Sequence, residues 1–253
     1  MKRIVLILTL FLLFTSTVFA QSATVRKELT IPASDGFSLK ATLEYPKIKT
    51  QKEFKTVVLL HSLGYNSAWW ENLPKTLLDK GYAVLAIDLR GHGKSIYNTR
   101  LVRTSWSNMT ASAYQKYPSD VIQIIDYVKA ENPKRIFFNE WAIVSADIGG
   151  SAGIIASAQM ENKPKTIVIL SPVVKTHGLF VPVKLANLDN VDIFSITGTE
   201  DHTGQKAQDY LQRFAQAGFV TYVSEAHATG MLLLKNDKSL TNIITTWITD
   251  YLK

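Results

Sequence analysis

The chain has 253 residues, of which 46% are hydrophobic, and it contains no cysteine. This length and hydrophobic content fit one large α/β domain with a sizeable core, and the absence of cysteine excludes disulfides. The formal charge is +7, or +5 without Lys2 and Arg3, but the basic residues are scattered and form no block. Nucleic-acid binding is therefore not expected, and at most a mild attraction to anionic surfaces or substrates follows.

The first twenty residues have the layout of an export signal. Lys2 and Arg3 provide a positive start, residues 4–14 are apolar, and Val-Phe-Ala at residues 18–20 is a small-x-small cleavage site. We predict a signal peptide over residues 1–20, cleavage after Ala20, and a secreted or periplasmic protein with no stable membrane insertion after cleavage. The alternative is a retained membrane anchor, because residues 4–25 carry no charge and a span needs about 20 mainly apolar residues.

Beyond the signal, strand patterns alternate with helix patterns. Residues 25–31 and 37–45 predict an antiparallel hairpin at a sheet edge. Further buried strands are predicted at residues 56–60, 82–87, 142–144, 166–170, 191–196 and 219–223. Helices are predicted at residues 67–80, 117–130, 148–160, 205–216 and 240–252. This alternation predicts a three-layer α/β fold, in which a mostly parallel central sheet is covered by helices on both faces.

A short apolar strand, a tight turn and a helix of small residues follow one another at residues 142–160. The turn is Ser145-Ala-Asp-Ile-Gly149, with small residues two before and two after its tip, Asp147. This is the layout of a nucleophile elbow, in which a strand turns sharply into a helix and lifts one side chain above the sheet. The other interpretation is that Asp147 is a helix N-cap, since an Asp carboxylate accepts hydrogen bonds from the amides of the first turn.

Four loops are predicted at the carboxyl ends of the parallel strands, where ligands bind in such sheets. They are residues 61–66, the Asp147 turn, and the loops that hold Asp201 and His227. Because these strand ends meet at one edge of the sheet, we expect residues far apart in the sequence to converge there.

Four segments resemble the α/β-hydrolase family in their order along the chain. Leu60-His-Ser-Leu-Gly64 resembles its oxyanion loop, and Asp88-Leu-Arg-Gly-His-Gly-Lys-Ser95 resembles its Asp-x-Arg-Gly-His-Gly-x-Ser turn. The Asp147 turn stands where the family has its nucleophile, usually Ser. Thr197-Gly-Thr-Glu-Asp201 and Ala226-His227 stand where the family has its acid and its histidine. The short form resembles the cap-less esterases that are similar to dienelactone hydrolase.

The resemblance implies roles for five residues. His227 would be the general base, and Asp201 would orient its imidazole through a hydrogen bond. The backbone amides of Leu63 and Ile148 would form the oxyanion hole. Asp147 would be the working residue at the elbow.

The likeness covers residues 25–253, so one α/β-hydrolase domain is expected over that range. His61 and His92 are expected to shape their loops and not to react. The histidines have no metal-ligand spacing, and the sequence has no GxGxxG or GxxxxGK[ST] motif. We therefore predict no metal and no cofactor, and a small-molecule substrate.

The aspartate at the elbow leaves three functions open. The first is an exported hydrolase of small esters or related electrophiles that uses Asp147, Asp201 and His227. The second is a catalytically inactive binding protein on the hydrolase fold. The third is an enzyme similar to haloalkane dehalogenases or epoxide hydrolases, in which the carboxylate attacks carbon.

The residues around Asp147 argue against the third function. Ile148 follows Asp147, where family dehalogenases have a halide-holding Trp, and residues 173–190 are too few for a full cap. Attack of Asp147 on an ordinary ester would give a mixed anhydride, which is more activated than the ester. Ester hydrolysis is therefore better served by a carboxylate that helps His227 activate water.

Overall fold

Apolar segments with strand and helix periodicity form the elements of the computed structural model, which describes residues 24–48, 53–132 and 134–253. The predicted signal peptide lies outside the described residues. The strands are β1 (Thr24–Pro32), β2 (Phe37–Pro46), β3 (Phe54–Leu60), β4 (Ala83–Asp88), β5 (Tyr97–Asn98), β6 (Ile136–Ala146), β7 (Thr166–Leu170), β8 (Lys175–Thr176), β9 (Leu179–Phe180), β10 (Asp192–Gly198) and β11 (Phe219–Ser224). The α-helices are α1 (Leu73–Asp79), α2 (Ala111–Tyr114), α3 (Tyr117–Glu131), α4 (Ile148–Ser157), α5 (Pro182–Leu185), α6 (His202–Leu211), α7 (Leu232–Asn236) and α8 (Ser239–Tyr251). Short 3-10 turns occur at η1 (Ser67–Trp69), η2 (Trp106–Asn108) and η3 (Gln212–Phe214).

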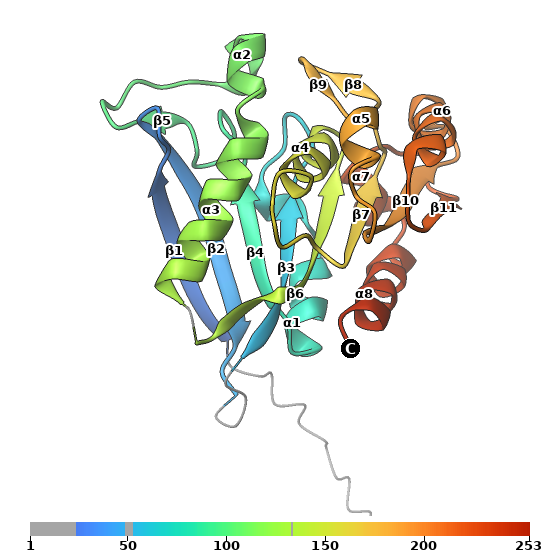
Figure 1. Cartoon of the computed structure of the whole chain (residues 1–253), viewed down its shortest axis with the longest axis horizontal. Helices are drawn as coiled ribbons and strands as arrows, with labels where there is room; N and C mark the ends of the chain where they lie inside the picture. The colour runs from blue at the N-terminus through green and yellow to red at the C-terminus, as the bar shows by residue number, and fades with distance from the viewer. Residues whose placement is uncertain (1–23, 49–52, 133) are drawn as a thin grey trace, which may run out of the picture.

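The central sheet has the strand order β1-β2-β4-β3-β6-β7-β10-β11, with β5 paired to β2 (Figure 1). The pairs β1/β2, β2/β4 and β2/β5 are antiparallel, and the pairs from β4 through β11 are parallel. The predicted edge hairpin is confirmed, with Val25 opposite Tyr45. The predicted mostly parallel sheet is confirmed as well.

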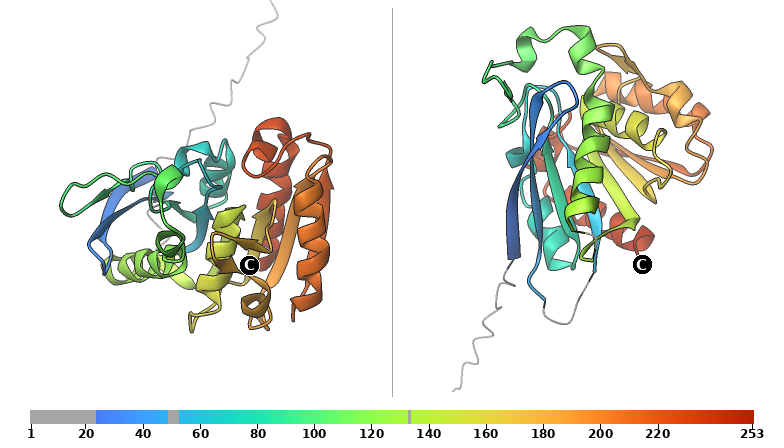
Figure 2. Two further views of the ribbon diagram at one scale, coloured as in Figure 1. Left: turned by 90° about the horizontal axis from the view of Figure 1, so that it is seen from above. Right: turned by 60° about the vertical axis from the view of Figure 1, so that its left-hand side comes forward.

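Alternation along the strands divides the apolar core between the two faces of the sheet. In β3, Val57 and Leu59 belong to the cluster that contains the apolar side chains of α1 and α8. The neighbouring Val58 and Leu60 belong to the cluster that contains those of α3 and α4. Figure 2 shows these helices on opposite sides of the sheet. Because a fully buried Val or Leu side chain contributes about 2 kcal/mol, both faces must be covered, and the predicted three-layer architecture is confirmed.

Three predicted helices differ from the structure by three residues or more. The helix predicted at residues 148–160 ends earlier, at Ser157 of α4. The helix expected at residues 67–80 is divided into η1 and α1, because Glu71 between them has a φ of 51°, which interrupts a right-handed helix. Helix α6 begins at His202, three residues before the predicted start. The elements α5, α7 and the β8–β9 hairpin were not predicted, since the two helices have four and five residues and each strand of the hairpin has two.

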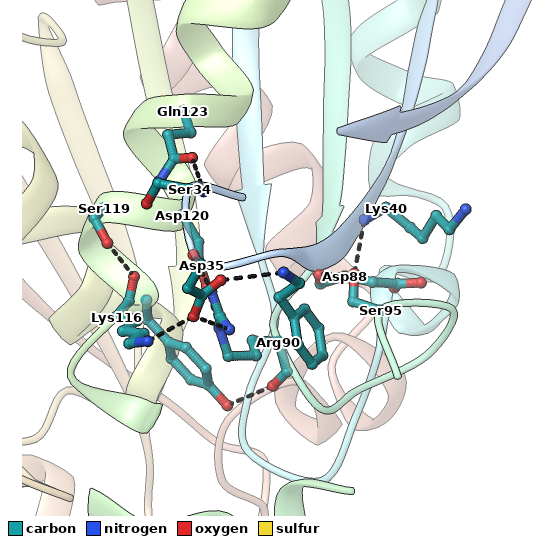
Figure 3. Close-up of polar contacts among 12 residues, drawn as sticks. Ser34, Asp35, Lys40, Asp88, Arg90, Ser95, Lys116, Ser119, Asp120 and Gln123 are labelled. Atoms are coloured by element: carbon teal, nitrogen blue, oxygen red, sulfur yellow. Dashed lines mark hydrogen bonds and ion pairs between the residues drawn. The ribbon is translucent and has the colours of Figure 1, made fainter. Parts of the chain in front are cut away.

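The turn that follows β4 is held by a buried arginine (Figure 3). Arg90 is 5% exposed, and its guanidinium donates to both carboxylate oxygens of Asp120 at 2.8 and 2.7 Å and to Asp35 at 2.8 Å. The hydroxyl of Tyr117 donates to the Arg90 carbonyl at 3.0 Å. The Asp88 carboxylate accepts two backbone amides, both at 2.8 Å. These bonds fix the Asp-x-Arg-Gly-His-Gly-x-Ser turn beside the oxyanion loop.

Candidate active site

Asp147 stands at the tip of the turn between β6 and α4. Its backbone has φ 50° and ψ −121°, a conformation that is disfavoured for residues with a side chain and that marks a strained position. The crossing behind the tip is crowded, since a Cβ on Gly149 would lie 2.3 Å from the Leu60 carbonyl oxygen. Ser145 donates its hydroxyl to the Val168 carbonyl at 2.9 Å, so this hydroxyl bonds to the neighbouring strand. The strand–turn–helix geometry of an elbow is therefore present.

The carboxylate of Asp147 lies against the oxyanion loop. The backbone amide of Leu63 donates to its Oδ2 at 3.2 Å. Within the described chain it makes no capping hydrogen bond with α4, so the helix-cap interpretation is wrong. Burial raises the pKa of this carboxyl, while the amides of Leu63 and Ile148 act in the opposite direction. The two amides that were expected to face a substrate oxyanion therefore act on the carboxylate of Asp147.

Two buried histidines hold the oxyanion loop in place. The Gly64 amide donates to His92 Nε2 at 2.9 Å. His61 accepts the Leu89 amide on Nε2 at 2.9 Å, and its Nδ1 donates to the Ser62 carbonyl at 2.8 Å. Burial lowers the pKa of both rings, that of His61 to about 4. Both rings are therefore neutral at neutral pH, which leaves one nitrogen of each free to accept a backbone amide.

Asp201 and His227 are not joined by the predicted hydrogen bond. Asp201 caps α6, with its Oδ1 accepting the Gly204 amide at 2.9 Å, and its Oδ2 has no partner among the described residues. His227 Nδ1 instead lies 2.8 Å from Glu200 Oε1, and its side chain is 72% exposed. The expected Asp201–His227 contact is wrong because α6 begins directly after Asp201, so the first-turn amides of this helix take up its carboxylate.

A cavity of about 540 Å³ opens at the carboxyl ends of the strands. Asp147, Glu200, Asp201 and His202 line it, whereas His227 is not among its lining residues. The structure therefore brings Asp147 and Asp201 to one cavity with Leu63, whereas His227 is hydrogen-bonded to Glu200 and does not line that cavity.

The loop that carries His227 is tied to the cavity by two serines. The Gly230 amide donates to Ser171 Oγ at 2.7 Å, and the Met231 amide donates to Ser62 Oγ at 3.3 Å. Neither serine was predicted from the sequence, and Asp201 was predicted as the partner of His227 in place of Glu200. Asp is a favoured N-cap residue, so an Asp201 close before a predicted helix could have directed attention to Glu200 as the free carboxylate.

Within residues 24–48, 53–132 and 134–253, no group of three or more His, Cys, Asp or Glu side chains could hold a metal ion. No helix in this part of the chain is long and apolar enough to cross a bilayer.

The sheet order and the elbow define an α/β-hydrolase fold. A family model described as serine aminopeptidase, S33, matches residues 51–194, which is more than half of the chain. The chain therefore belongs to this family, although its elbow carries Asp147 where Ser is usual.

Solved structures with the same fold are esterases and related hydrolases. An esterase of Pyrococcus furiosus is 16% identical with a TM-score of 0.67, and the alignment covers 90% of this chain and 92% of that one. A dienelactone hydrolase of Anabaena variabilis is 15% identical with a TM-score of 0.66, covering 91% and 99%. An acylaminoacyl peptidase of Pyrococcus horikoshii is 11% identical with a TM-score of 0.71, covering 91% and 42%. At these identities the likeness establishes the fold alone. Comparison with curated proteins gives no match.

Proposed function

We propose that the chain is an exported hydrolase of small esters or related electrophiles, with Asp147 as its general base. The observation that carries this proposal is the placement of the Asp147 carboxylate, which is held by the Leu63 amide at 3.2 Å and lines the cavity. Burial raises the pKa of Asp147, and a more basic carboxylate is a better proton acceptor.

The proposed reaction needs no covalent intermediate. A water molecule attacks the ester carbonyl carbon while Asp147 accepts the water proton. The tetrahedral intermediate then breaks its bond to the alcohol oxygen, which takes the proton back from Asp147. The products are a carboxylic acid and an alcohol, and the Asp147 carboxylate is regenerated. The backbone amide of Leu63 holds the carboxylate in position for both proton transfers.

We assign Glu200, in place of Asp201, as the acidic partner of His227. Glu200 both lines the cavity and bonds to the imidazole, whereas the Oδ1 of Asp201 is committed to α6. The side chains of Glu200 and His227 are both exposed, so their contact adds little to the free energy of unfolding. Its effect is to orient the His227 imidazole. His227 takes no step in the reaction above, so Glu200→Gln should leave both turnover and the melting temperature unchanged. Asp201→Asn should chiefly affect the start of α6. A large loss of turnover in Glu200→Gln would show that the Glu200–His227 pair takes part in the reaction, and would contradict a mechanism carried by Asp147 alone.

The central test is Asp147→Asn in a screen of esters and lactones. The amide keeps an acceptor for the Leu63 amide but cannot take a proton, so turnover should fall at least about a hundredfold, the usual scale for a general base. Stability should be equal or higher, because a buried charge is removed. Asp147→Ala should lose about 1 kcal/mol, because the Leu63 amide loses its partner. Full turnover in Asp147→Asn would refute the proposal.

One observation favours a second function, a binding protein on the hydrolase fold. His227 is directed to Glu200 and does not line the cavity that holds Asp147. Asp147→Ser would rebuild the usual nucleophile at the elbow. If the wild type hydrolyses no ester and Asp147→Ser acquires activity, the binding function is favoured.

Single turnover in ¹⁸O-labelled water separates the general-base reaction from attack by Asp147 on carbon. The general base leaves the Asp147 carboxylate unlabelled, whereas a dehalogenase-like ester intermediate introduces the label into it.

Export is tested independently of catalysis. Mass spectrometry of the protein from its native host should give Gln21 as the first residue, because the predicted cleavage follows Ala20. Recovery of the intact N-terminus in the membrane fraction would contradict export by cleavage.

A further inference from the structure

A hairpin tip at residues 97–103, which begins with β5 and precedes η2, projects from the body of the molecule (Figures 1 and 2). A β-bridge between Tyr97 and Arg103 closes its base. Asn98 organises the turn, since its Oδ1 accepts the amides of Arg100 and Val102, both at 2.9 Å. The tip is therefore an ordered structure with a defined outer surface.

The outer surface of the tip displays apolar side chains. Leu101 is 80% exposed and Val102 is 57% exposed. The backbone of Leu101 has a φ of 61°, which is disfavoured for leucine, and it is held there by the hydrogen bond from its amide to the Asn98 carbonyl at 2.9 Å. Exposed aromatic rings stand close in sequence on either side, with Tyr97 42% and Trp106 37% exposed. Exposed apolar side chains grouped this closely in sequence favour an interaction site.

Arginines flank the apolar pair on both sides. Arg100 and Arg103 are exposed, and within the described residues neither guanidinium has an ion-pair partner. By contrast, Arg26 and Arg90 are each paired with carboxylates. The tip therefore presents two uncompensated positive charges around two apolar side chains.

We infer that the 97–103 tip docks on an anionic lipid surface. In such docking Leu101 and Val102 enter the boundary between headgroups and acyl chains, while Arg100 and Arg103 contact lipid phosphates. Tyr97 and Trp106 have the amphipathic rings that are enriched at this depth. A protein partner would need an acidic rim around an apolar pocket, whereas an anionic bilayer supplies both features everywhere on its surface.

Docking of the tip would bring the cavity close to the lipid. The Trp106 ring lies against Gly64, where an added Cβ would be 3.3 Å away. Leu63, which precedes Gly64 in the chain, donates a hydrogen bond from its backbone amide to the Asp147 carboxylate. The inference does not rest on the proposed hydrolysis, since binding to lipid is measured without turnover.

The test is cosedimentation of the chain from Gln21 onward with two kinds of vesicle. The wild type should sediment with phosphatidylcholine vesicles that contain phosphatidylglycerol, and binding should weaken as salt is added. It should bind much less to phosphatidylcholine alone. Arg100→Gln/Arg103→Gln should reduce partitioning about thirtyfold, since each basic side chain near an anionic surface contributes about a factor of five. Leu101→Ser/Val102→Ser should reduce it by about tenfold or more.

Matched variants control for charge and apolar area. Lys80→Gln/Lys206→Gln removes the same charge from exposed sites on other elements, and Val220→Ser/Val223→Ser removes exposed apolar side chains from β11. Both controls should bind like the wild type, and all variants should keep its melting temperature. Equal binding by the tip variants and the controls would overturn the inference. So would a wild-type dimer that Leu101→Ser/Val102→Ser converts to a monomer, because the tip would then bind a second copy.

Discussion

Acid should destabilise this protein through His61, a buried ring at the end of β3. The folded state holds this imidazole neutral, because burial lowers its pKa from 6.5 to about 4. The unfolded chain takes up a proton near pH 6.5, whereas the folded chain does so only near pH 4. The unfolded state therefore binds more protons between these values, and stability must fall as the pH falls through this window.

The magnitude follows from the two pKa values. A shift from 6.5 to about 4, at about 1.4 kcal/mol per pH unit, gives a loss of about 3 kcal/mol between pH 6.5 and 4. The side chain is fully buried, so solvent screening does not reduce this value. His92, whose pKa burial also lowers, adds to the loss in the same direction.

Urea unfolding at pH 7.5 and 4.5 measures the effect. His61→Gln can still accept the Leu89 amide and cannot titrate, so its loss of stability between these pH values should be smaller by about 2 to 3 kcal/mol than that of the wild type. His202→Gln removes an exposed imidazole and should leave the pH dependence unchanged. If His61→Gln and the wild type lose the same stability, the ring is not held neutral by the fold, and the reasoning fails.

Other predictions concern packing and the buried charges. Gly149→Ala should cost about 3 kcal/mol or prevent folding, since its Cβ would meet the rigid Leu60 carbonyl at 2.3 Å. Gly153→Ala, whose Cβ would meet a flexible leucine methyl at 3.1 Å, should be tolerated, and equal melting temperatures of the two variants would contradict the argument. Asp120→Asn should cost about 3 kcal/mol in urea unfolding, because it takes one of two carboxylates from a buried Arg90. A loss below about 1 kcal/mol would mean that the remaining carboxylate suffices.

The sequence by itself determined the secondary structure and the fold class of this protein. Strand periodicity, helix periodicity and turn residues are local properties, so the hairpin at the sheet edge, the parallel strands and their helices followed from short windows of sequence. The nucleophile elbow could also be predicted from the sequence. A strand that turns directly into a helix needs small residues on both sides of the tip, and here these are Ser145 and Gly149. The order of the loops placed Asp147, Asp201 and His227 at one edge of the sheet.

Only the tertiary structure decided which side chains meet at that edge. Glu200, Asp201 and His202 are adjacent in sequence, and their directions depend on the residue at which α6 begins. Because α6 begins at His202, Asp201 becomes its cap, and the exposed Glu200 is left to bind His227. The direction of the Asp147 carboxylate was set in the same way, by the Leu63 amide on a loop that is distant in sequence. Local pattern fixes where a residue stands, whereas hydrogen bonds from other segments fix where its side chain points.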